Sequence, residues 1–387
     1  DTAKERGSAG GQALMQAVDP TQYYTLYADA TQAQFDAASI SKLYLKIEKS
    51  QFYALFGDYN TGLSLTELGR YSRTLNGVKA EYKGERVSYN AFASSTAQSF
   101  GKDEIQGQGI SGLYHLRTSN IVVNTEKIHI ETRDRLRPEI ILKSQDYTRY
   151  IDYQIDYTDG TLFFREPIPA LDTALNPVYI VAEYESDSKT QAKMTYGGRI
   201  ATKVGENSEV GLTHLHEGTE GRAANLTAVD TTVPFHEKTK LHAEVAHSQR
   251  DGIADTSSGS AYVVEVTHTD KDQSGRAYLR KQDMGFGLGQ QSSSATGTQK
   301  VGVDGQFKLN DELQLRTTTY RESKDTADIS AQRNVVEAQV QWGAVGVGLR
   351  AANESDSEGQ SSQTRQLTAN IGHEMLDKQL TLRASAE

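Results

Sequence analysis

The stretch KVGVDGQFKLNDELQLRTTTYRE, residues 300–322, decides how this chain folds. In its first half, Val301, Val303 and Phe307 alternate with polar residues, and successive side chains of an extended strand point to opposite faces. The polar segment 310–312 interrupts the alternation, which then resumes. The stretch therefore predicts a β-hairpin with one apolar face and one polar face.

The same alternation recurs from residue 192 to the end of the chain. One set of alternate positions is apolar and includes Met194, Tyr196, Ile200, Val245, Val264, Val336, Val340, Val347, Leu349 and Leu367. The other set carries charges of both signs, and from it we predict a lumen-facing wall that includes Lys193, Arg199, Lys203, Asp304, Lys308, Arg316, Glu337, Arg350 and Arg383. Simple hydration of that wall and selectivity for solutes are equally compatible with the pattern.

The connections between the expected strands alternate in length. Short turns at 205–208, 236–239, 270–274, 310–312, 343–344 and 375–378 alternate with long polar segments at 216–224, 249–260, 286–298, 321–332 and 352–363. Outer-membrane barrels have this asymmetry, with short periplasmic turns, longer external loops and strands of about 9–11 residues. Together with two hairpins expected before residue 98, the pattern predicts an all-β fold, an antiparallel up-and-down transmembrane β-barrel with about sixteen visible strands.

A soluble β-sandwich shows the same alternation, so three further features favour a membrane. The apolar positions are rich in small residues, which pack a dry core poorly but suffice against lipid chains. The opposite positions carry full charges, as the lumen of a wide barrel does. Interfacial girdles are expected from Tyr82, Phe235, Phe307 and Trp342 near the short turns and from Phe286 and Tyr320 near the long loops.

Composition excludes several classes of protein. The 387 residues carry a net charge of −10, which argues against a nucleic-acid partner because no basic stripe is present to neutralise phosphates. No run of about 18 apolar residues exists, so no transmembrane helix is predicted. The absence of Cys fits the bacterial cell envelope. Because the chain begins at Asp1 and stops in mid-pattern, we expect a processed protein or a fragment whose barrel continues past Glu387.

The chain is predicted to divide into four parts. Residues 1–40 form an N-terminal arm or loop, 41–97 the first barrel strands, 98–186 an inserted surface β domain, and 187–387 the remaining barrel hairpins. The insert is expected because its strand-like runs mix parity and hold four of the six prolines, which remove donors from a β-ladder. It follows a short turn, so it is expected on the external side, with the long loops.

Five segments within residues 43–186 occur in a characteristic order. They are FGDYNTGLSLTELGRYSRTLNGVKAEYKGERVSYNAFAS (56–94), GKDEIQGQGISGLYHL (101–116), EKIHI (126–130), DYQIDYTDGTLFFREPI (152–168) and VYIVAEYE (178–185). This string resembles very large bacterial outer-membrane proteins, including the translocon barrel family of the type IX secretion system. The resemblance implies an outer-membrane barrel with an extracellular β domain. It carries over neither catalytic residues nor the secretion function, because this chain is far shorter than such a translocon.

Two groups of residues are weak candidates for metal binding. Asp152, Asp156 and Asp159 offer carboxylates of the kind that bind Ca²⁺, but their spacing matches no EF-hand loop and a hairpin turn is the more ordinary interpretation. His214 and His216 share one face of a strand, as chelating residues do. We expect neither group to hold a metal, and the sequence predicts no cofactor and no enzymatic activity.

Three functions are compatible with the sequence. The leading hypothesis is a non-enzymatic β-barrel of a Gram-negative outer membrane that acts in export, attachment or assembly at the cell surface. The alternatives are a porin-like diffusion channel for small solutes and a soluble extracellular β-rich adhesin. The expected partners are outer-membrane lipid and lipopolysaccharide, with other envelope or surface proteins as further partners.

Overall fold

The computed structural model describes residues 24–25, 32–33 and 45–386, with gaps at 136–139, 173–175, 188–191, 206, 220–221, 252–255, 292–294, 327–328 and 376–379. Most of the predicted N-terminal arm, residues 1–40, therefore lies outside the described residues, where only the short strands β1 (Tyr24–Thr25) and β2 (Gln32–Ala33) pair with each other. No helix in the described part of the chain is long and apolar enough to cross a membrane.

One antiparallel sheet of sixteen strands dominates the fold and is confirmed as the large meander that the sequence predicts. Its first strands are β3 (Leu45–Lys49), β4 (Phe52–Asn60), β5 (Thr74–Lys83) and β6 (Val87–Thr96). It continues with β14 (Lys193–Val204), β15 (Ser208–Thr219), β16 (Arg222–His236), β17 (Thr239–Asp251), β18 (Thr256–Thr269) and β19 (Gln273–Gln282). It ends with β20 (Thr298–Lys308), β21 (Leu313–Asp325), β22 (Ser330–Trp342), β23 (Val345–Asp356), β24 (Ser361–Met375) and β25 (Leu380–Ala386).

The chain leaves this sheet after β6 and returns to it at β14, and these two strands pair directly. Thr96 is the register partner of Lys193, so the sheet is continuous across the excursion. Everything between them, which we call the insert, contains β7 (Gln98–Gln106), β8 (Tyr114–His115), β9 (Lys127–Arg133), β10 (Ile141–Tyr147), β11 (Tyr153–Asp156), β12 (Thr161–Phe164) and β13 (Val178–Asp187). The insert therefore interrupts the chain without interrupting the hydrogen bonding of the sheet.

The insert is a small β-domain with a core of its own. Its strands form a four-stranded sheet in the order β10-β9-β13-β7 and a three-stranded sheet in the order β11-β12-β8. Ile128, Phe164, Ile180 and Tyr184 pack in the core between them and are almost completely buried. Tyr114 and Phe164 meet edge to face, with ring centroids 5.6 Å apart, which is a favoured geometry for an aromatic pair.

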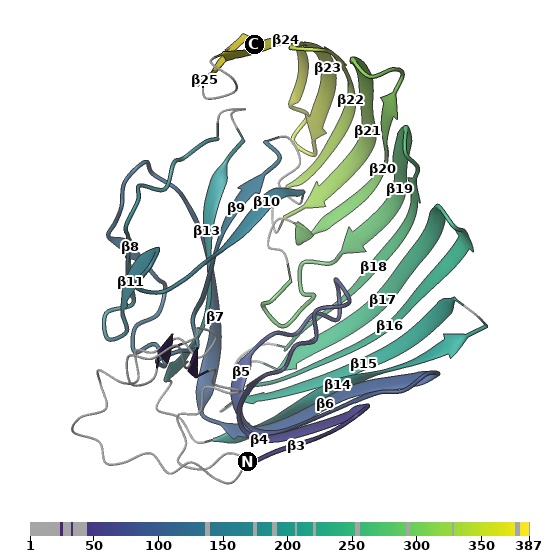
Figure 1. The fold of residues 1–387 in the computed structure, drawn as a ribbon. Helices are drawn as coiled ribbons and strands as arrows, with labels where there is room; N and C mark the ends of the chain where they lie inside the picture. Colours follow the sequence, from purple (N-terminus) through teal and green to yellow (C-terminus); the bar gives the residue numbers. More distant parts are fainter. Residues whose placement is uncertain are drawn as a thin grey trace.

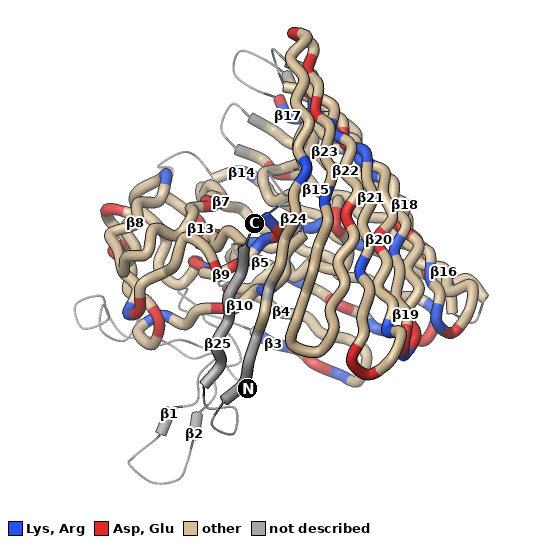
Figure 2. The backbone as a smooth tube through the Cα atoms, turned by 90° about the horizontal axis from the view of Figure 1, so that it is seen from above, with Lys and Arg blue, Asp and Glu red and all other residues tan. Residues whose placement is uncertain are grey.

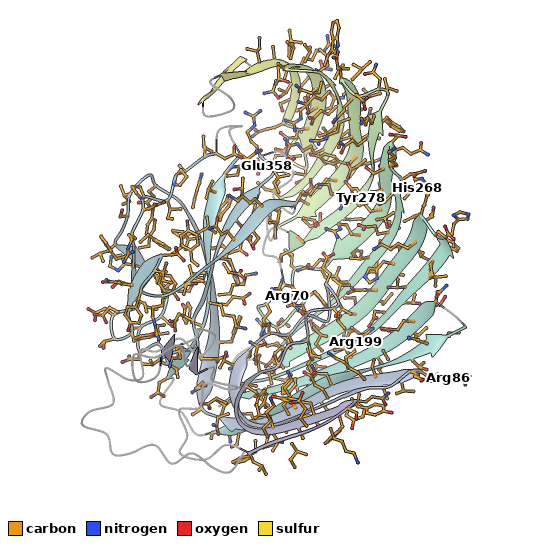
Figure 3. All side chains as sticks on the ribbon, in the orientation of Figure 1. Arg70, Arg86, Arg199, His268, Tyr278 and Glu358 are labelled. Carbon is orange, nitrogen blue, oxygen red and sulfur yellow. The ribbon has the colours of Figure 1, made fainter. Side chains whose placement is uncertain are left out.

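The large sheet curves, so it has a concave face toward the insert and a convex face away from it (Figure 1). The period of two assigns alternate residues of each strand to opposite faces, and Figure 3 shows Arg199 and Tyr278 on the concave side and His268 on the convex side. The predicted apolar positions lie on the convex face, where Leu349 is 62% and Val336 60% exposed. No other layer of described residues covers these two side chains, so the alternation of the sequence does not reflect a second, stacked sheet.

The strands extend through most of the segments that the sequence predicts as long loops, and that prediction was wrong for four of the five. Residues 216–224, 249–260, 321–332 and 352–363 are largely paired, with connections of only a few residues between strands. In the last of these, Ser361 is the register partner of Ser355. The physical reason is that backbone N–H and C=O groups form the hydrogen bonds of a β-ladder. Polar side chains do not weaken these hydrogen bonds where both faces of the strands are in water. Of the five segments predicted as long loops, only 286–298 lies mostly in a long connection, residues 283–297.

Two of the six predicted girdle aromatics are placed differently by the structure. Phe235 and Trp342 are 63% and 67% exposed on strands next to short turns, as expected of interfacial residues. Tyr320 is 4% exposed because it lies on the concave face, and Phe286 is 7% exposed because the loop that carries it folds inward. These two side chains therefore belong to the interior, and their assignment to a girdle was wrong.

The sheet is open between its two end strands in the part of the chain that the structure describes. The strand order runs from β3 at one end to β25 at the other, and neither pairs with a further strand on its outer edge. Figure 1 shows these two strands at opposite ends of the curved sheet. The all-β class and the large antiparallel sheet are thus confirmed, whereas closure into a barrel stays a prediction.

Replacing Leu349 with Arg tests whether hydrocarbon covers the convex face. A cation on the lipid side of a barrel near the bilayer centre lowers the free energy of unfolding by about 2–4 kcal/mol. The matched control is Gln339→Arg, since Gln339 lies on the concave face of the neighbouring strand and should tolerate a charge. The measurement is denaturant unfolding from phospholipid vesicles. Equal free energies of unfolding for the two variants would contradict a lipid-facing convex side.

Candidate functional site

The loop between β4 and β5, residues 61–73, folds against the concave face of the sheet. The backbone N–H groups of Glu67 and Leu68 donate to the carboxylate of Glu244 on β17, at 2.8 and 2.7 Å. Arg280 on β19 donates to the Glu67 carboxylate at 2.8 Å. The loop is therefore tied to two strands of the wall, and it occupies part of the concave side.

Arg73, the last residue of this loop, joins the loop to the insert and to the sheet. Its Nε and Nη2 donate to the two carboxylate oxygens of Glu185 on β13, at 2.8 and 2.5 Å, and it also donates to Glu217 on β15. The hydroxyl of Tyr71 donates to Glu217 at 2.9 Å. Burial alone would lower the pKa of Arg73, but the two carboxylates raise it overall, so the guanidinium is charged. We call Tyr71, Arg73, Glu185 and Glu217 the Arg73 cluster.

A polar cleft of about 540 Å³ lies beside this cluster, between the insert and the same end of the sheet. The insert contributes Lys102, Glu104, Arg117, Arg133 and Tyr179 to its lining. The sheet and the 283–297 loop contribute Arg250, Gln282, Phe286, Gly289, Gln291 and Thr296. The cleft is the candidate functional site, because it combines an aqueous space with charged side chains from two separate parts of the fold.

The register of the insert explains why one of its faces is charged. Glu183 on β13 pairs with Lys102 on one side and with Lys127 on the other, so these three residues share a face. The next positions along the same face include Glu104 on β7. The opposite face carries the core residues such as Ile180. The insert therefore turns an apolar face to its own second sheet and a charged face to the concave wall.

Ion pairs hold the cations of the cleft in fixed positions. Arg133 donates to Glu104 at 2.9 Å and to Glu131 at 2.8 Å, and its guanidinium lies 4.8 Å from the ring centroid of Tyr179. Burial alone would lower the pKa of Arg133, but the two carboxylates raise it overall. The Nζ of Lys102 lies 3.3 Å from the same Glu104 carboxylate. Both side chains are therefore held by the Glu104 carboxylate on the insert side of the cleft.

The predicted lumen-facing residues lie on the concave set of positions wherever their side chains are described. Arg199 donates to Asp230 at 3.0 Å and to Glu209 at 2.8 Å, and Asp304 accepts from Arg276 at 2.7 Å. Figure 2 shows Lys and Arg residues interspersed with Asp and Glu residues along the strands of the large sheet. The concave wall thus carries paired charges of both signs, and beneath the 61–73 and 283–297 loops it also carries buried apolar side chains such as Leu215, Leu226 and Val263.

The remaining predicted positions are less enclosed. Glu337 and Arg350 are register partners on adjacent strands. Exposed side chains are found at Lys193, Lys203, Lys308 and Arg316. The side chain of Arg383 lies outside the described residues. None of the described residues among them lines the cleft, and their exposure to a closed, water-filled lumen stays a prediction.

A glycine makes room for the Arg199 ion pair. A Cβ atom on Gly211 would lie 2.4 Å from Nη2 of Arg199 and 2.5 Å from Oδ1 of Asp230. These separations are far below van der Waals contact, so any other residue at this position would displace the pair. The sequence places Gly211 between the two charged strands for this reason.

The weak metal candidates have other partners in the structure. The carboxylate of Asp156 accepts the backbone N–H groups of Thr158 and Asp159 at 2.8 and 3.0 Å, which makes it part of a turn. Asp152 accepts the backbone N–H of Thr148 at 2.7 Å. Across the described residues, no group of three or more His, Cys, Asp or Glu side chains is arranged to hold a metal ion.

The two histidine candidates lie on the convex face. The Nδ1 of His216 lies 2.7 Å from the side-chain oxygen of Asn225, and its ring stacks on Tyr196 with centroids 4.8 Å apart. The Nδ1 of His214 lies 3.0 Å from the hydroxyl of Thr227. Both side chains are engaged with neighbours across the ladder, which accounts for their place on one face.

Sequence reasoning missed the residues that build the cleft. A signal was present, because Lys102 and Glu104, like Lys127, His129, Glu131 and Arg133, alternate with other residues as one face of a strand does. That alternation predicts a charged face on the insert, but not which surface it meets. No sequence signal identifies Arg250 or Arg73 as members of the site, since their partners are remote in the chain.

A second buried carboxylate lies inside the insert. Oε1 of Glu126 accepts from the hydroxyl of Tyr157 at 2.7 Å and from Nη1 of Arg149 at 3.3 Å. Its Oε2 is buried and has no hydrogen-bond partner among the described residues. Burial raises the pKa of Glu126 to about 7, against the opposing effect of Arg149.

Comparison with known proteins gives only distant likenesses. No family model and no curated protein matches the sequence. OccK11 (OpdR) of Pseudomonas aeruginosa is 9% identical, with a TM-score of 0.39, over 89% of this chain and 80% of its own. OccK2 (OpdF) of the same organism, solved in complex with glucuronate, is 10% identical, with a TM-score of 0.37, over 89% and 80% of the two chains. A BenF-like porin from Pseudomonas fluorescens Pf-5 is 9% identical, with a TM-score of 0.37, over 89% and 77%. At these values the likeness assigns neither a family nor a function.

Replacing Arg73 with Gln should destabilise the protein strongly, because Glu185 would remain buried without its partner. Removing one member of a buried ion pair lowers the free energy of unfolding by about 3–5 kcal/mol. The matched control is Arg70→Gln, in an exposed position of the same loop, for which we expect a change within about 0.5 kcal/mol. Denaturant unfolding of both variants measures the difference. A loss at Arg73 no greater than that at Arg70 would show that the cluster does not hold the three elements together.

The buried Glu126 should make the stability of the insert depend on pH. Its pKa in the folded protein is about 7, above its ordinary value of 4.5, so the folded state binds this proton more tightly. Proton binding by Glu126 therefore adds about 3 kcal/mol to the free energy of unfolding. This contribution is complete below the pKa of the unfolded chain, 4.5, and is lost as pH rises through the pKa of the folded protein, about 7. Glu126→Gln should remove this dependence. Free energies of unfolding at pH 5 and pH 8 test it, and an unchanged pH slope in the variant contradicts the assignment.

Proposed function

We propose that this protein is an outer-membrane β-barrel protein of a Gram-negative bacterium, and that it conducts small polar solutes by porin-like diffusion. The observation that carries the proposal is the contrast between the two faces of the large sheet. Large aliphatic side chains such as Val303 and Leu349 are exposed on the convex face, while paired charges line the concave face. A lipid-facing exterior and a wet interior account for both faces at once.

The height of the apolar band supports the outer membrane in particular. On β22 the apolar convex positions run from Val336 to Trp342, which is about 20 Å of extended strand. On β23 they run from Val345 to Ala351, the same length, and are followed by Asn353. Strands of such barrels are tilted by about 35–45°, so 20 Å of strand spans about 15 Å along the membrane normal, less than the usual apolar band of about 25 Å. The bacterial outer membrane is thinner than average, so it is the bilayer nearest in thickness to this short band.

Closure of the sheet is part of the proposal. In hydrocarbon an unpaired backbone N–H or C=O group costs several kcal/mol, so an open sheet edge is not viable there. The outer edges of β3 and β25 must therefore be joined, directly or through further strands, when the protein is in a membrane. The curvature of the sheet in Figure 1 is in the direction that closure requires.

The insert and two loops would narrow the passage at one end. The 61–73 loop lies against the concave wall, the 283–297 loop folds inward, and the insert is anchored beside them by the Arg73 cluster. The cleft between the insert and the wall is then the route that remains for solutes. Its charged lining favours small hydrated molecules over apolar ones.

A second function, export, attachment or assembly at the cell surface, is favoured by a different observation. The contacts that anchor the insert are buried and ionic, as suits a permanent surface module more than a mobile gate. The resemblance to the type IX translocon family belongs to this second proposal. A soluble adhesin is less compatible with the structure, because it would hold the apolar convex face in water.

Outer-membrane lipid and lipopolysaccharide are the partners that we propose for the convex face. Above the apolar band, on the side of the inward-folded loops, the convex positions include the exposed cation Arg321, and the exposed Arg365 lies level with the edge of the band, beside Ala351. Cations at this level suit the phosphate groups of an anionic outer leaflet. We propose no nucleic-acid partner.

Planar-bilayer recording tests the main proposal. We expect stable ohmic conductance from the purified protein, because the cleft leaves an aqueous route past the insert. Excising residues 98–191 and joining the ends with a short Gly-Ser linker should raise that conductance several-fold, since Thr96 and Lys193 are already neighbours in the sheet. A variant with the same linker added in the 343–344 turn, with nothing removed, is the control.

The outcomes separate the two functions. Conductance that rises on excision supports a channel constricted by the insert. A bilayer that is silent with both the full chain and the excised variant would overturn the diffusion proposal and leave the surface role.

A further inference from the structure

The cleft differs in charge from the chain as a whole. The protein carries a net charge of −10, yet the residues that line the cleft include four cations and one carboxylate. Two further carboxylates, Asp103 and Glu131, pair with Arg117 and Arg133 without lining the space. Counting them, there are four positive charges and three negative ones, and of the three carboxylates Glu104 alone lines the cleft.

The cations on the insert side keep donors for a ligand. Arg133 uses its Nε and one N–H from each Nη on Glu104 and Glu131, and a guanidinium has five N–H donors in all. Stacking on Tyr179 fixes the plane of the guanidinium. The ammonium of Lys102 lies between Glu104 and the backbone carbonyl of Gln290, at 3.3 and 3.5 Å. These long separations leave its three donors only weakly engaged.

The wall side offers a third cation, held by the inward-folded loop. Nη2 of Arg250, at the end of β17, donates to the backbone carbonyl of Gly287 at 2.8 Å. Gly287 has a φ of +103°, a conformation that other residues rarely adopt, so the loop is shaped to present this carbonyl. The backbone N–H of Gly287 donates in turn to the hydroxyl of Ser248 at 2.8 Å. Arg250 lines the cleft, and among the described residues the Gly287 carbonyl is the one hydrogen-bond acceptor of its guanidinium.

We infer that the cleft binds a small oxyanion, a carboxylate or phosphate group, between Arg250 of the wall and Lys102 and Arg133 of the insert. A planar or tetrahedral oxyanion accepts several N–H donors at once, which is the feature that two guanidinium groups recognise. The ligand would bridge the insert and the wall, two elements that the Arg73 cluster and the loops also connect. The inference rests on the proposed function in taking the anion to be a solute on its route past the insert.

The test is titration calorimetry of the full chain in detergent at low ionic strength, with sodium phosphate and sodium succinate as separate probes. We expect saturable binding of at least one probe, weakening as salt is added because the attraction is electrostatic. Arg250→Gln and Lys102→Gln should each lower the affinity by about tenfold or more, since each removes a charge-assisted donor. The probe that binds more tightly tells a carboxylate solute from a phosphate solute.

The matched control is Lys240→Gln, which removes the same charge from an exposed position near the opposite end of β17. It should bind both anions as the original protein does. Retained heat-modifiable mobility in electrophoresis shows that each variant is folded.

Two results would overturn the inference: no saturable binding of either anion, or affinities that Arg250→Gln and Lys102→Gln leave unchanged. Neither result touches the conductance of the protein, so diffusion without a specific anion site would stand. Conversely, anion binding by a protein that is silent in bilayers would keep the site and remove the channel.

Discussion

The fold depends on one constraint, the opposite environments of the two faces of every strand in the large sheet. Because side chains alternate, adjacent residues of a strand point to opposite faces, so the exposed apolar residues gather on the convex face and the charged residues on the concave face. The register carries this assignment from strand to strand, so that Val303, Thr319, Val336 and Ala351 form one convex row. A slip of one residue in any pairing would exchange the two faces, and so the pattern also fixes the register.

The concave side is organised by ion pairs that cross between elements. Arg73 contacts Glu185 of the insert and Glu217 of the wall, and Glu244 accepts two backbone N–H groups of the inward-folded loop. Such groups are costly to bury alone and are tolerated because each carboxylate has its donor. These directional contacts add to an apolar core, in which Leu68 and Phe286 of the two loops pack in one cluster with Leu226 of the wall. Between the insert and the concave wall, the contacts leave space for the aqueous cleft.

The sequence predicted which segments form strands of the sheet better than it predicted the residues at which those strands end. The alternation of Val345, Val347 and Leu349 is strong enough to place β23 and its face without any structure. The boundary of that strand was missed, because beyond the apolar band the residues are Ser, Gly and Asp, which are also typical of loops. The ladder continues there because its backbone groups still find partners. Phe286 was wrongly assigned to an interfacial girdle for a related reason, because the composition of a loop does not determine the direction in which the loop folds.

By itself, the sequence determined the all-β class, the antiparallel meander and which residues of a strand share a face. These follow from local chemistry, because the period of two and the positions of turn residues act within one or two strands. Only the tertiary structure decided that the insert lies beside the concave wall, that Arg73 joins three elements, and that Arg250 faces Lys102 and Arg133 across a cleft. Those contacts join residues more than a hundred positions apart, and such partners are brought together only when the curvature of the whole sheet is in place.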